Sequence, residues 1–529
     1  AMKDRTIIQW DKDDLEALAL LKVDVLALGM LTAIRKTLAL LGTPQQPLRI
    51  QDIPRGDKAT YDMLSRADSI GVFQVESRAQ MNMLPRLKPQ SYYDLVIEVA
   101  IVRPGPIQGD MVHPYLKRRD GVEPVDYPSP EVEAVLSRTL GVPIFQEQVI
   151  KLAMVAAGFT GGEADQLRRA MAAWKRTGNL RQYQQKLIAG MLERGYSQDF
   201  AERICRQIEG FGEYGFPESH AASFALLVYV SAWLKCHHPA AFCCALLNSQ
   251  PMGFYSPAQL VADVRRHRVE VLPISLNHSD WDCTLEPGTD VDKPKLRLGL
   301  RLVKGLSTKA AKSLLHARPV DGFSSIGEAR RHCPVVDKKA WQALAASGAL
   351  NGLAGHRHQA RWALLSEDPG LLLGETGMLA ESEAVYLPAP TETEDLTADF
   401  QYTGLSLGRH PVALLREQGW LQRCLRAEQL TQCRHGQLVH VAGLVTNRQR
   451  PGSASGVTFV TLEDESGQIN LVVWQDTARA QRQALLTARV LQVSGVLERE
   501  GEVIHIVAGR LQDISYRWQD LQVKSRDFR

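Results

Sequence analysis

The chain has 529 residues, of which 45% are hydrophobic and 23% are charged, a composition typical of globular domains and unlike that of disordered or fibrous chains. At roughly 150 residues per domain, this length predicts about three or four domains. The formal charge of +3, from 62 basic and 59 acidic side chains, is too small to indicate a nucleic-acid partner by itself. The longest uncharged apolar run, 221–234, is too short for a membrane-spanning helix, which needs about 20 residues.

The eight cysteines are not spaced in pairs as they are in zinc ribbons or zinc fingers. The densest group of potential ligands consists of Cys236, His237, His238, Cys243 and Cys244. These ligands are adjacent rather than spaced for tetrahedral coordination, so we expect no zinc site there. The N-terminus also lacks the basic and then apolar pattern of a secretory signal. We therefore expect reduced thiols in a soluble, cytoplasmic protein.

Hydrophobic periodicity divides the chain into four segments, of which the first two are 1–41 and 42–283. In the first segment, an apolar run at 20–26 predicts a short strand, and a helix is expected from Thr32 onward. The second segment is dominated by helical periodicity, which proline and glycine turns interrupt. The helices expected in it include 163–174, 181–194, 199–209 and 219–235.

The third segment, 284–429, opens with a β-like run at 296–302 and continues in short helices. Between Glu381 and Asp399 it carries six acidic residues, no basic residue and two prolines. This composition predicts an exposed connection with little packing.

The fourth segment, 430–529, changes to the period of β-strands. Five β-rich runs lie at short spacing, at 438–445, 456–462, 469–474, 490–496 and 503–507. A helical stretch at 477–486 separates the third run from the fourth. Five strands with a helix in this place follow the chain order of an OB-fold barrel. We therefore expect a multidomain protein that is mainly α-helical, followed by an all-β barrel.

Lys22 and Asp24 lie in the first predicted strand, where a period of two places them on one face. An aspartate is disfavoured inside such an apolar strand, so a second group is expected to offset its cost. One interpretation is a carboxylate ligand for a hard cation such as Mg²⁺, with the lysine near phosphate oxygens. An ion pair at a sheet edge explains the same pattern equally well.

Basic side chains occur at two notable places in the second segment. Arg103 precedes a Pro-Gly-Pro turn, whose prolines fix the backbone and could hold the arginine toward an anionic ligand. Further on, two basic pairs seven residues apart share one broad helix face. Its members are Arg168, Arg169, Lys175 and Arg176. This face is a candidate phosphate-binding surface, and a solvated cationic face is the alternative.

Ser219 is a good N-cap for the apolar helix that follows it, which places His220 in the first helical turn. Free N–H groups and the helix dipole attract phosphate at such a position, so His220 is a candidate ligand of a triphosphate. A histidine that only completes the cap is the alternative interpretation.

The stretch 302–310 has the pattern of a helix-hairpin-helix turn, in which a tight glycine turn presents N–H groups to a DNA phosphate. Gly305 supplies the turn, and Lys304 and Lys309 flank it. Ser307 stands where a second glycine is expected, and it can cap the next helix. An ordinary turn between two helices is the alternative.

The barrel segment is not basic, with seven Arg and Lys residues against eight Asp and Glu residues between positions 436 and 515. A grip on a nucleic-acid strand would therefore depend on local arginines and aromatic groups. The candidates are Arg448, Arg450, Phe459 and Trp474. A barrel that acts as a spacer, or that contacts another protein, is the alternative.

Taken together, these windows resemble the C-family of bacterial DNA polymerases, the family of the replicative polymerase III α subunit. The matching stretches occur in family order, at 22–32, 71–78, 103–106, 146–148, 167–171 and 214–220. With the hairpin and barrel segments, the resemblance spans nearly the whole chain. Within the family the chain looks most like the error-prone (ImuC-type) branch, because Pro217 and Glu218 stand where replicative members typically have Asn and Lys.

The resemblance implies a domain order along the chain: 1–41 as the end of the palm, 42–283 as the fingers, 284–429 as a helix-hairpin-helix region with an acidic linker, and 430–529 as the OB-fold domain and tail. Of the three metal-binding aspartates of the family's palm, only Asp24 has a match. The PHP domain and most of the palm would then be missing. The resemblance implies a catalytically inactive C-terminal fragment.

The resemblance also implies roles for single residues in template-directed nucleotidyl transfer during translesion synthesis and DNA damage tolerance. Asp24 would help to hold Mg²⁺. The nucleotide-binding residues would be Lys22, Arg103, Arg168, Arg169 and His220. The DNA-binding residues would be Lys175, Arg176, Lys304, Lys309, Arg448 and Arg450.

The implied partners are primer–template DNA, dNTP, the sliding clamp and proteins of the ImuA and ImuB type, with no membrane. Candidate clamp-binding peptides are 376–379 and 395–400, although both are poor matches, and a partner protein could supply that contact instead. Two other interpretations stay open. The chain could be a fragment of a replicative polymerase III α subunit, or it could be purely a DNA- and protein-binding module.

Overall fold

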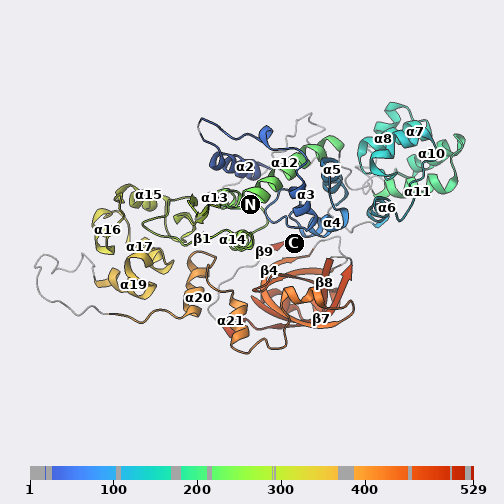
Figure 1. Cartoon of the computed structure of the whole chain (residues 1–529). Coiled ribbons are helices and arrows are strands. Elements are labelled where there is room, and N and C mark those ends of the chain that lie inside the picture. The colour runs from blue at the N-terminus through green and yellow to red at the C-terminus, as the bar shows by residue number, and fades with distance from the viewer. Residues whose placement is uncertain are drawn as a thin grey trace, which may run out of the picture.

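The structure of the protein, a computed structural model, describes residues 18, 27–43, 45–102, 109–167, 180–210, 217–288, 290, 293–366, 386–450, 456–500, 503–518 and 526–528. Helices dominate as far as α21 (Pro411–Glu417), and a β-barrel follows (Figure 1). This arrangement confirms the expected fold class. Among the described residues, no helix combines the length and the hydropathy that crossing a membrane requires. All eight cysteines are free thiols.

The centre of the helical region is α12 (Glu218–His237), which packs against α5 and α13. Its residues Ala221, Val228 and Leu234 are each 0% exposed, as expected for a helix that is apolar on most sides. We call the helices around it the inner lobe. They are α2 (Leu28–Leu41), α3 (Lys58–Ser65), α4 (Arg78–Leu87), α5 (Tyr92–Ile101), α13 (Pro239–Asn248) and α14 (Pro257–Arg266).

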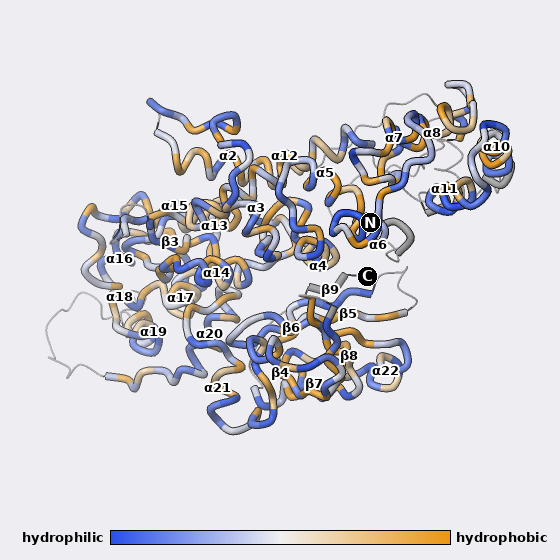
Figure 2. Tube along the Cα trace, turned by 45° about the vertical axis from the view of Figure 1, so that its right-hand side comes forward, coloured by the Kyte–Doolittle hydropathy of each residue, from blue (hydrophilic) through white to orange (hydrophobic). Residues whose placement is uncertain are grey.

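A second group of helices, the outer lobe, lies beside the inner lobe in both Figure 1 and Figure 2. It comprises α7 (Pro130–Leu136), α8 (Gln146–Ala157), α10 (Leu180–Glu193) and α11 (Gln198–Gly210). Between the lobes lies α6 (Gly109–Arg119), whose Arg119 forms an ion pair with Asp94 of α5. The helices expected at 181–194, 199–209 and 219–235 are confirmed as α10, α11 and α12. The one expected at 163–174 lies partly outside the described residues.

The first helix begins earlier than the sequence predicts. α2 starts at Leu28, not at Thr32, and Ala27 precedes it in the left-handed region with φ of 61°. The Thr32 hydroxyl instead donates to the carbonyl of Leu28, 2.9 Å away, within the helix. The strand predicted at 20–26 lies outside the described residues.

Four side chains form an ionic cluster around a buried lysine, the Lys235 node, at the end of α12. Lys235 is 2% exposed, and its Nζ lies 2.8 Å from Asp68 and 2.9 Å from Asp263. The same ammonium donates to the carbonyl of Ile70, 3.0 Å away, and His267 lies 2.7 Å from Asp68. Burial would raise the pKa of Asp68, but the hydrogen bond of His267 and the charge of Lys235 lower it below its ordinary value. The node joins α12 to α14 and to the loop after α3.

The third segment begins with a small sheet and continues in helices. Its strands are β1 (Val271–Leu272), β2 (Thr284–Glu286) and β3 (Lys295–Arg297), in the order β1-β3-β2. β1 and β3 are parallel, whereas β2 and β3 are antiparallel. The helices are α15 (Thr308–Ala317), α16 (Ile326–His332), α17 (Lys338–Ala346), α18 (Asn351–Ala354) and α19 (Arg357–Ser366). The β-like run predicted at 296–302 is strand only as far as Arg297, and a 3₁₀ helix follows at Leu300–Leu302.

In the described part of the acidic stretch, residues 386–391 form a mostly exposed connection, as its composition predicts, but the residues that follow are packed. Its second half belongs to α20 (Glu392–Tyr402), which Thr391 opens with a reciprocal capping box. Leu396 is 1% exposed and Phe400 is 9% exposed, and four residues of spacing place both on one face. This apolar pair packs with residues of α21 and the barrel, which is why the segment is ordered helix despite its charge.

The barrel confirms the OB-fold topology expected from the sequence. Its strands are β4 (Leu438–Gln449), β5 (Thr458–Glu463), β6 (Gln468–Val473), β7 (Val490–Glu500) and β8 (Val503–Asp513). They pair in the order β5-β6-β8-β7-β4, and the β4–β5 pairing closes the ring. Two short helices, α22 (Gln475–Ala480) and α23 (Arg482–Thr487), lie between the third and fourth strands. A further strand, β9 (Arg526–Phe528), pairs with β4 in parallel.

Replacing Lys235 with methionine is expected to lower the free energy of unfolding by about 3 kcal/mol, because the buried carboxylate of Asp263 and the partly buried carboxylate of Asp68 would lose the cation that they share. Urea titration followed by circular dichroism measures the change. Lys58→Met is the matched control, since Lys58 pairs with Asp62 on the surface, 2.6 Å apart, and exposed pairs contribute little. Equal shifts of the urea midpoint in the two variants would contradict the structural role of the node.

His267 makes the stability of the node depend on pH. Its hydrogen bond to Asp68 raises the pKa of His267 above the ordinary value, although burial opposes the shift. A raised pKa gives a stabilisation that is fully present below the unfolded-state pKa of about 6.5 and is lost as the pH rises through the folded-state pKa. We therefore expect the urea midpoints of the wild type and of His267→Gln to differ more at pH 6 than at pH 9. A difference that is the same at both values would rule this linkage out.

Candidate nucleotide and nucleic-acid interface

The N-terminus of α12 is the place where the two lobes meet. The Glu218 side chain accepts hydrogen bonds from the Tyr93 hydroxyl, 2.9 Å away, and from Arg138, 3.1 Å away. The guanidinium of Arg138 also lies over the ring of Tyr93, 4.0 Å from its centroid. Burial and the bond to Glu218 raise the pKa of Tyr93, so its hydroxyl keeps the proton that it donates. We call Tyr93, Arg138, Glu147 and Glu218 the lobe junction.

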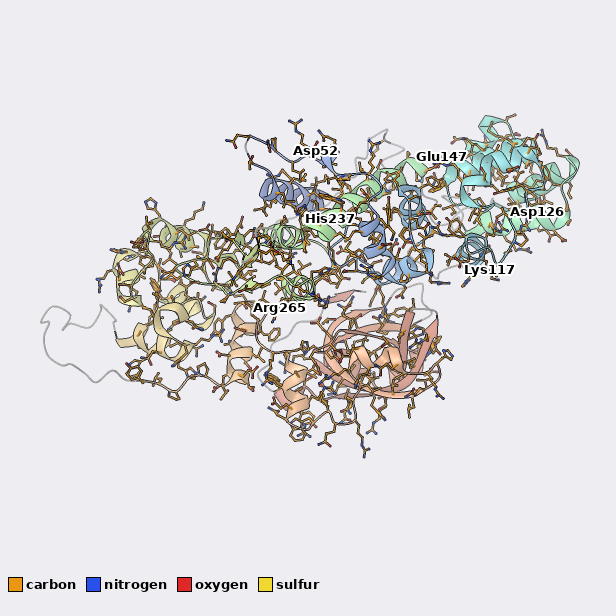
Figure 3. The ribbon with its side chains drawn as sticks, in the orientation of Figure 1. Asp52, Lys117, Asp126, Glu147, His237 and Arg265 are labelled. Carbon is orange, nitrogen blue, oxygen red and sulfur yellow. The ribbon has the colours of Figure 1, made fainter. Side chains whose placement is uncertain are left out.

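Glu147 contributes the fourth contact of the lobe junction, from the outer lobe (Figure 3). Its carboxylate accepts a hydrogen bond from the backbone N–H of Glu218, 2.9 Å away. The next residue, Gln148, stabilises its own lobe by accepting hydrogen bonds from the N–H groups of Ile144 and Phe145, 2.9 and 3.1 Å away. The stretch 146–148 therefore contains one residue that joins the lobes and one that holds the outer lobe together.

His220 lies in the first turn of α12, as predicted, but the cap of the helix differs from the prediction. The helix begins at Glu218 with Pro217 as its N-cap, so Ser219 lies inside the helix and does not cap it. The His220 ring is half-buried and lies 4.2 Å from the ring of Phe224. An anion at this end of α12 would meet His220 but also the carboxylates of the lobe junction, and it therefore needs further cations nearby.

Most of the residues predicted to bind metal or nucleotide lie outside the described residues. They are Lys22, Asp24, Arg103, Arg168 and Arg169. Lys175 and Arg176, which are predicted to bind DNA, lie outside the described residues as well. Their roles stay predictions. The basic face at 168–176 begins directly after a helical stretch of the outer lobe at 161–167, and it is the predicted source of the cations that His220 alone does not supply.

Two groups among the described residues bring three possible metal ligands within 4.8 Å of one another. One belongs to the Lys235 node, where an ammonium already satisfies both carboxylates. The other consists of Asp57, Cys236 and His237. There the carboxylate of Asp57 caps α3 by accepting from the N–H of Thr60, 2.8 Å away, and it lies 2.8 Å from His237. Both groups thus have structural roles within the inner lobe.

The hairpin turn before α15 has the backbone geometry that the sequence predicts. Gly305 has φ of 93°, a value that few other residues adopt. Ser307 is the N-cap of α15 and accepts a hydrogen bond from the N–H of Ala310, 3.1 Å away. The predicted cap is confirmed, and the turn lies at the surface.

The two lysines of the hairpin have different surroundings. Lys309 lies in the first turn of α15 and is exposed, as a phosphate contact requires. The ammonium of Lys304 instead donates to the carbonyls of Phe400 and Gln401, each 2.9 Å away, at the end of α20. A cation stabilises a helix C-terminus. This placement differs from the predicted contact of Lys304 with duplex phosphates.

The two barrel arginines also differ. Arg450 is exposed at the end of β4, next to the first loop of the barrel. Arg448 is 7% exposed, and its guanidinium donates to the carbonyls of Leu485 and Ala488 at the end of α23. The structure therefore corrects the prediction that Arg448 reaches a DNA strand, because its hydrogen-bonding groups face the barrel's own helix.

An unpredicted contact joins the inner lobe to the barrel. The guanidinium of Arg78, at the start of α4, lies 5.1 Å from the ring centroid of Phe459 in β5, and it donates to the carbonyl of Leu471 in β6, 3.4 Å away. Burial lowers the pKa of Arg78 to about 10, so it stays charged at neutral pH. Of the two aromatic candidates on the barrel, Phe459 thus contacts the inner lobe, whereas Trp474 is 56% exposed.

The candidate clamp-binding peptide at 395–400 is corrected by the structure. It lies inside α20, with Leu396 and Phe400 buried, and so it is not an accessible extended peptide. The other candidate, 376–379, lies outside the described residues.

Sequence reasoning did not assign roles to Arg138, Glu147 and Arg78. Arg78 and Glu147 lie in two of the stretches that resemble the polymerase family, 71–78 and 146–148, so both had a signal in the sequence. Arg138 had none, because its partners are 45 positions before it and 80 positions after it along the chain.

Family models match three consecutive parts of this architecture. They are the bacterial DNA polymerase III alpha subunit finger domain at 30–195, a helix-hairpin-helix motif at 268–360 and an OB-fold nucleic acid binding domain at 439–514. Among solved structures, an asparaginyl-tRNA synthetase from Pyrococcus horikoshii matches 17% of this chain and 21% of its own, with 20% identity and a TM-score of 0.14, a likeness too small to carry an argument.

Relatives match the chain from end to end. It is 62% identical to an error-prone DNA polymerase of Methylococcus capsulatus and 63% identical to one of Alkalilimnicola ehrlichii, and the matches cover 100% of this chain and 52% and 51% of those proteins. An error-prone DNA polymerase of Pseudomonas aeruginosa is 56% identical, again over 100% of this chain and 51% of its own length. The chain thus spans about half the length of the curated relatives that it matches. With this identity and this domain order, the chain belongs to the C-family of bacterial DNA polymerases, in its error-prone branch.

Proposed function

We propose that the full-length protein is a DNA-directed DNA polymerase that performs template-directed nucleotidyl transfer in translesion synthesis and DNA damage tolerance. The present chain matches about half the length of the error-prone DNA polymerases that are similar to it. The observation that carries the proposal is the identity of 62–63% to error-prone DNA polymerases along the entire chain. The order of fingers, helix-hairpin-helix region and OB-fold barrel supports it, because these three parts suit a protein that holds a nucleotide, a duplex and a single strand.

In this proposal the N-terminus of α12 and the first basic pair of the face at 168–176 bind the triphosphate of the incoming dNTP. His220, Arg168, Arg169, Arg103 and Lys22 form that site. The lobe junction holds His220 at a fixed position relative to the outer lobe. A divalent cation, proposed to be Mg²⁺ and held in part by Asp24, would stabilise negative charge on the triphosphate when bound.

Primer–template DNA is proposed to contact Lys309 at the hairpin turn and Arg450 on the barrel, together with Lys175 and Arg176. Lys304 and Arg448 are left out because their donors face carbonyls of the protein itself. Proposed protein partners are the sliding clamp and proteins of the ImuA and ImuB type, in the cytoplasm. The 529-residue chain alone is proposed to bind DNA and nucleotide without activity, because only one of the family's three metal-binding aspartates has a match in it.

Primer extension by the full-length protein tests the proposal. We expect extension by the full-length protein, none by the 529-residue chain, and a loss of at least 100-fold in the full-length Asp24→Asn variant. Asp62→Asn, which changes an exposed aspartate of α3, is the control and is expected to keep full activity. Extension that survives Asp24→Asn would remove Asp24 from the catalytic site, and a full-length protein that extends no primer would refute the proposed activity.

The lobe junction predicts a selective effect on nucleotide binding. In the full-length polymerase, Glu218→Ala removes the acceptor shared by Tyr93 and Arg138, and we expect KM for dNTP to rise about 5- to 10-fold, the cost of one charge-assisted hydrogen bond. The value of kcat should change less than about 2-fold, because Glu218 does not touch the reacting atoms. Steady-state kinetics with varied dNTP measures both constants.

The conservative variant Glu218→Gln keeps an acceptor oxygen and should restore most of the affinity for dNTP. Asp62→Ala, which breaks the exposed Lys58–Asp62 pair, is the matched control and should leave KM unchanged. Equal losses in kcat and KM, or a KM that stays constant in Glu218→Ala, would show that the junction does not position the nucleotide site.

A further inference from the structure

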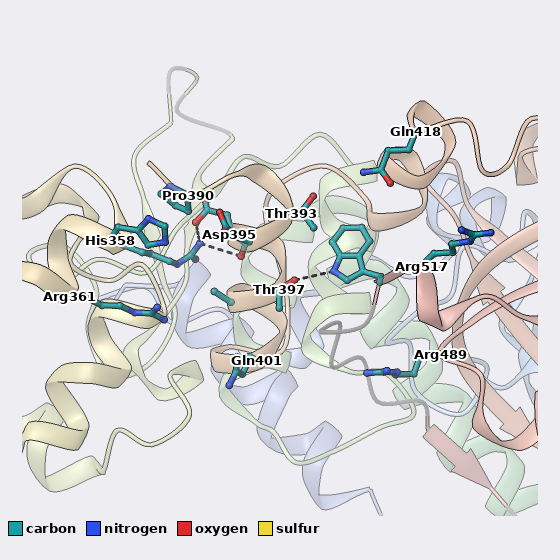
Figure 4. A pocket seen from close by; sticks show the side chains of 14 residues that line it. His358, Arg361, Pro390, Thr393, Asp395, Thr397, Gln401, Gln418, Arg489 and Arg517 are labelled. Carbon is teal, nitrogen blue, oxygen red and sulfur yellow. Dashed lines mark hydrogen bonds and ion pairs between the residues drawn. The ribbon is translucent and has the colours of Figure 1, made fainter. Parts of the chain in front are cut away.

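A polar cavity of about 630 Å³ lies between the helix-hairpin-helix region and the barrel (Figure 4). Its walls come from α19, from α20 and from the barrel side, where the start of β7 and the 3₁₀ helix at Ser515–Trp518 contribute. The wall from α19 and the wall from the barrel side each contribute arginine side chains. Arg361 lies on α19, Arg489 directly precedes β7, and Arg517 lies on the 3₁₀ helix. None of the cavity residues belongs to β5 or β6, the strands that contact the fingers through Arg78.

The carboxylates that line the cavity are already bound within the protein. Asp395 forms an ion pair with Arg357. Glu394 accepts hydrogen bonds from both the N–H and the hydroxyl of Thr391, 2.7 and 2.8 Å away, as part of the capping box of α20. Among the described residues, Arg361 has no ion pair. The cavity therefore presents net positive charge, which favours an anionic ligand.

Exposed aromatic side chains lie next to this charge. The guanidinium of Arg517 is 3.6 Å from the ring centroid of Trp420 and 4.6 Å from that of Tyr516. Trp420 is 48% exposed and Tyr516 is 52% exposed. Trp518, which also lines the cavity, is 5% exposed, and its indole N–H donates to the hydroxyl of Thr397, 3.0 Å away. Cations beside exposed aromatic rings are the combination that binds single-stranded nucleic acid.

We propose that this cavity binds the phosphodiester backbone of single-stranded DNA, with Arg361, Arg489 and Arg517 at the phosphates and with Trp420 and Tyr516 stacking on bases. The inference rests on the proposed function, because the protein is taken to act on DNA. It adds a second strand-binding site to the barrel, on a side that shares no residue with β5 and β6. A strand that leaves the hairpin region can thus be held where the two domains join.

The test is binding of a fluorescein-labelled oligo-dT of 20 nucleotides to the 529-residue chain across a salt series. In Arg361→Gln/Arg489→Gln/Arg517→Gln, the slope of log K against log salt concentration should fall by about 2, since each phosphate contact with a single strand contributes roughly 0.7. Affinity at 0.1 M salt should fall about 10- to 100-fold. Arg423→Gln/Arg479→Gln/Arg482→Gln removes the same charge from exposed arginines outside the cavity and should keep most of the slope.

Because Arg489 is half-buried, the double variant Arg361→Gln/Arg517→Gln, which changes only exposed residues, guards against loss of folding. It should lower the slope by about 1.4. Equal losses in the cavity variant and its control would show that only overall charge matters, and an unchanged slope would show that no strand binds there. Both results overturn the proposal, as does a cavity variant that loses binding of polyglutamate but keeps binding of oligo-dT, since that would indicate a docking site for an acidic protein.

Failure of this proposal is separable from failure of the proposed function. If the full-length protein extends primers but the cavity variant binds oligo-dT as tightly as the wild type, only the cavity assignment falls. If the assignment holds, primer extension by the full-length cavity variant should need about 10-fold more DNA for half-maximal rate while its maximal rate stays within about 2-fold.

Discussion

The buried ammonium of Lys235 is the interaction on which the arrangement of the fingers depends. It lies at one end of α12 and satisfies two carboxylates and a carbonyl that come from other elements of the inner lobe. A lysine that is 2% exposed is tolerated only because all these partners are in place. The orientation of α12 relative to α14 is thereby fixed. The contacts at the N-terminus of α12 depend on that orientation.

The opposite end of α12, its N-terminus, carries charged side chains next to the proposed nucleotide site. Glu218 and Glu147 bring two carboxylates to a helix N-terminus, a position that otherwise attracts anions. They bind Tyr93, Arg138 and a backbone N–H, so the lobes are held together with groups that a triphosphate would otherwise use. Nucleotide affinity at such a site depends on how many cations the outer lobe brings near His220.

The sequence predicts regular elements well and long-range partners poorly. Periodicity was sufficient for α10, α11, α12 and the five barrel strands, because each has a strong internal pattern. The expectation of little packing was wrong for the part of the acidic segment that forms α20. Overall composition does not reveal that Leu396 and Phe400 lie four residues apart and share one buried helix face. Arg448 looked like a surface arginine, but its acceptors lie 37 and 40 positions away. A local window of sequence cannot reveal partners that are this distant along the chain.

α20 has a mechanical consequence. Arg357 of α19 is paired with Asp395 and Asp399 on this helix, Lys304 of the hairpin caps its end, and its apolar face lies against the barrel side. The helix therefore connects the hairpin region and the barrel through ion pairs, hydrogen bonds and apolar contacts. Under the proposed function, in which the duplex lies at the hairpin and a single strand lies at the barrel, these contacts of α20 set how many nucleotides lie between the two binding surfaces.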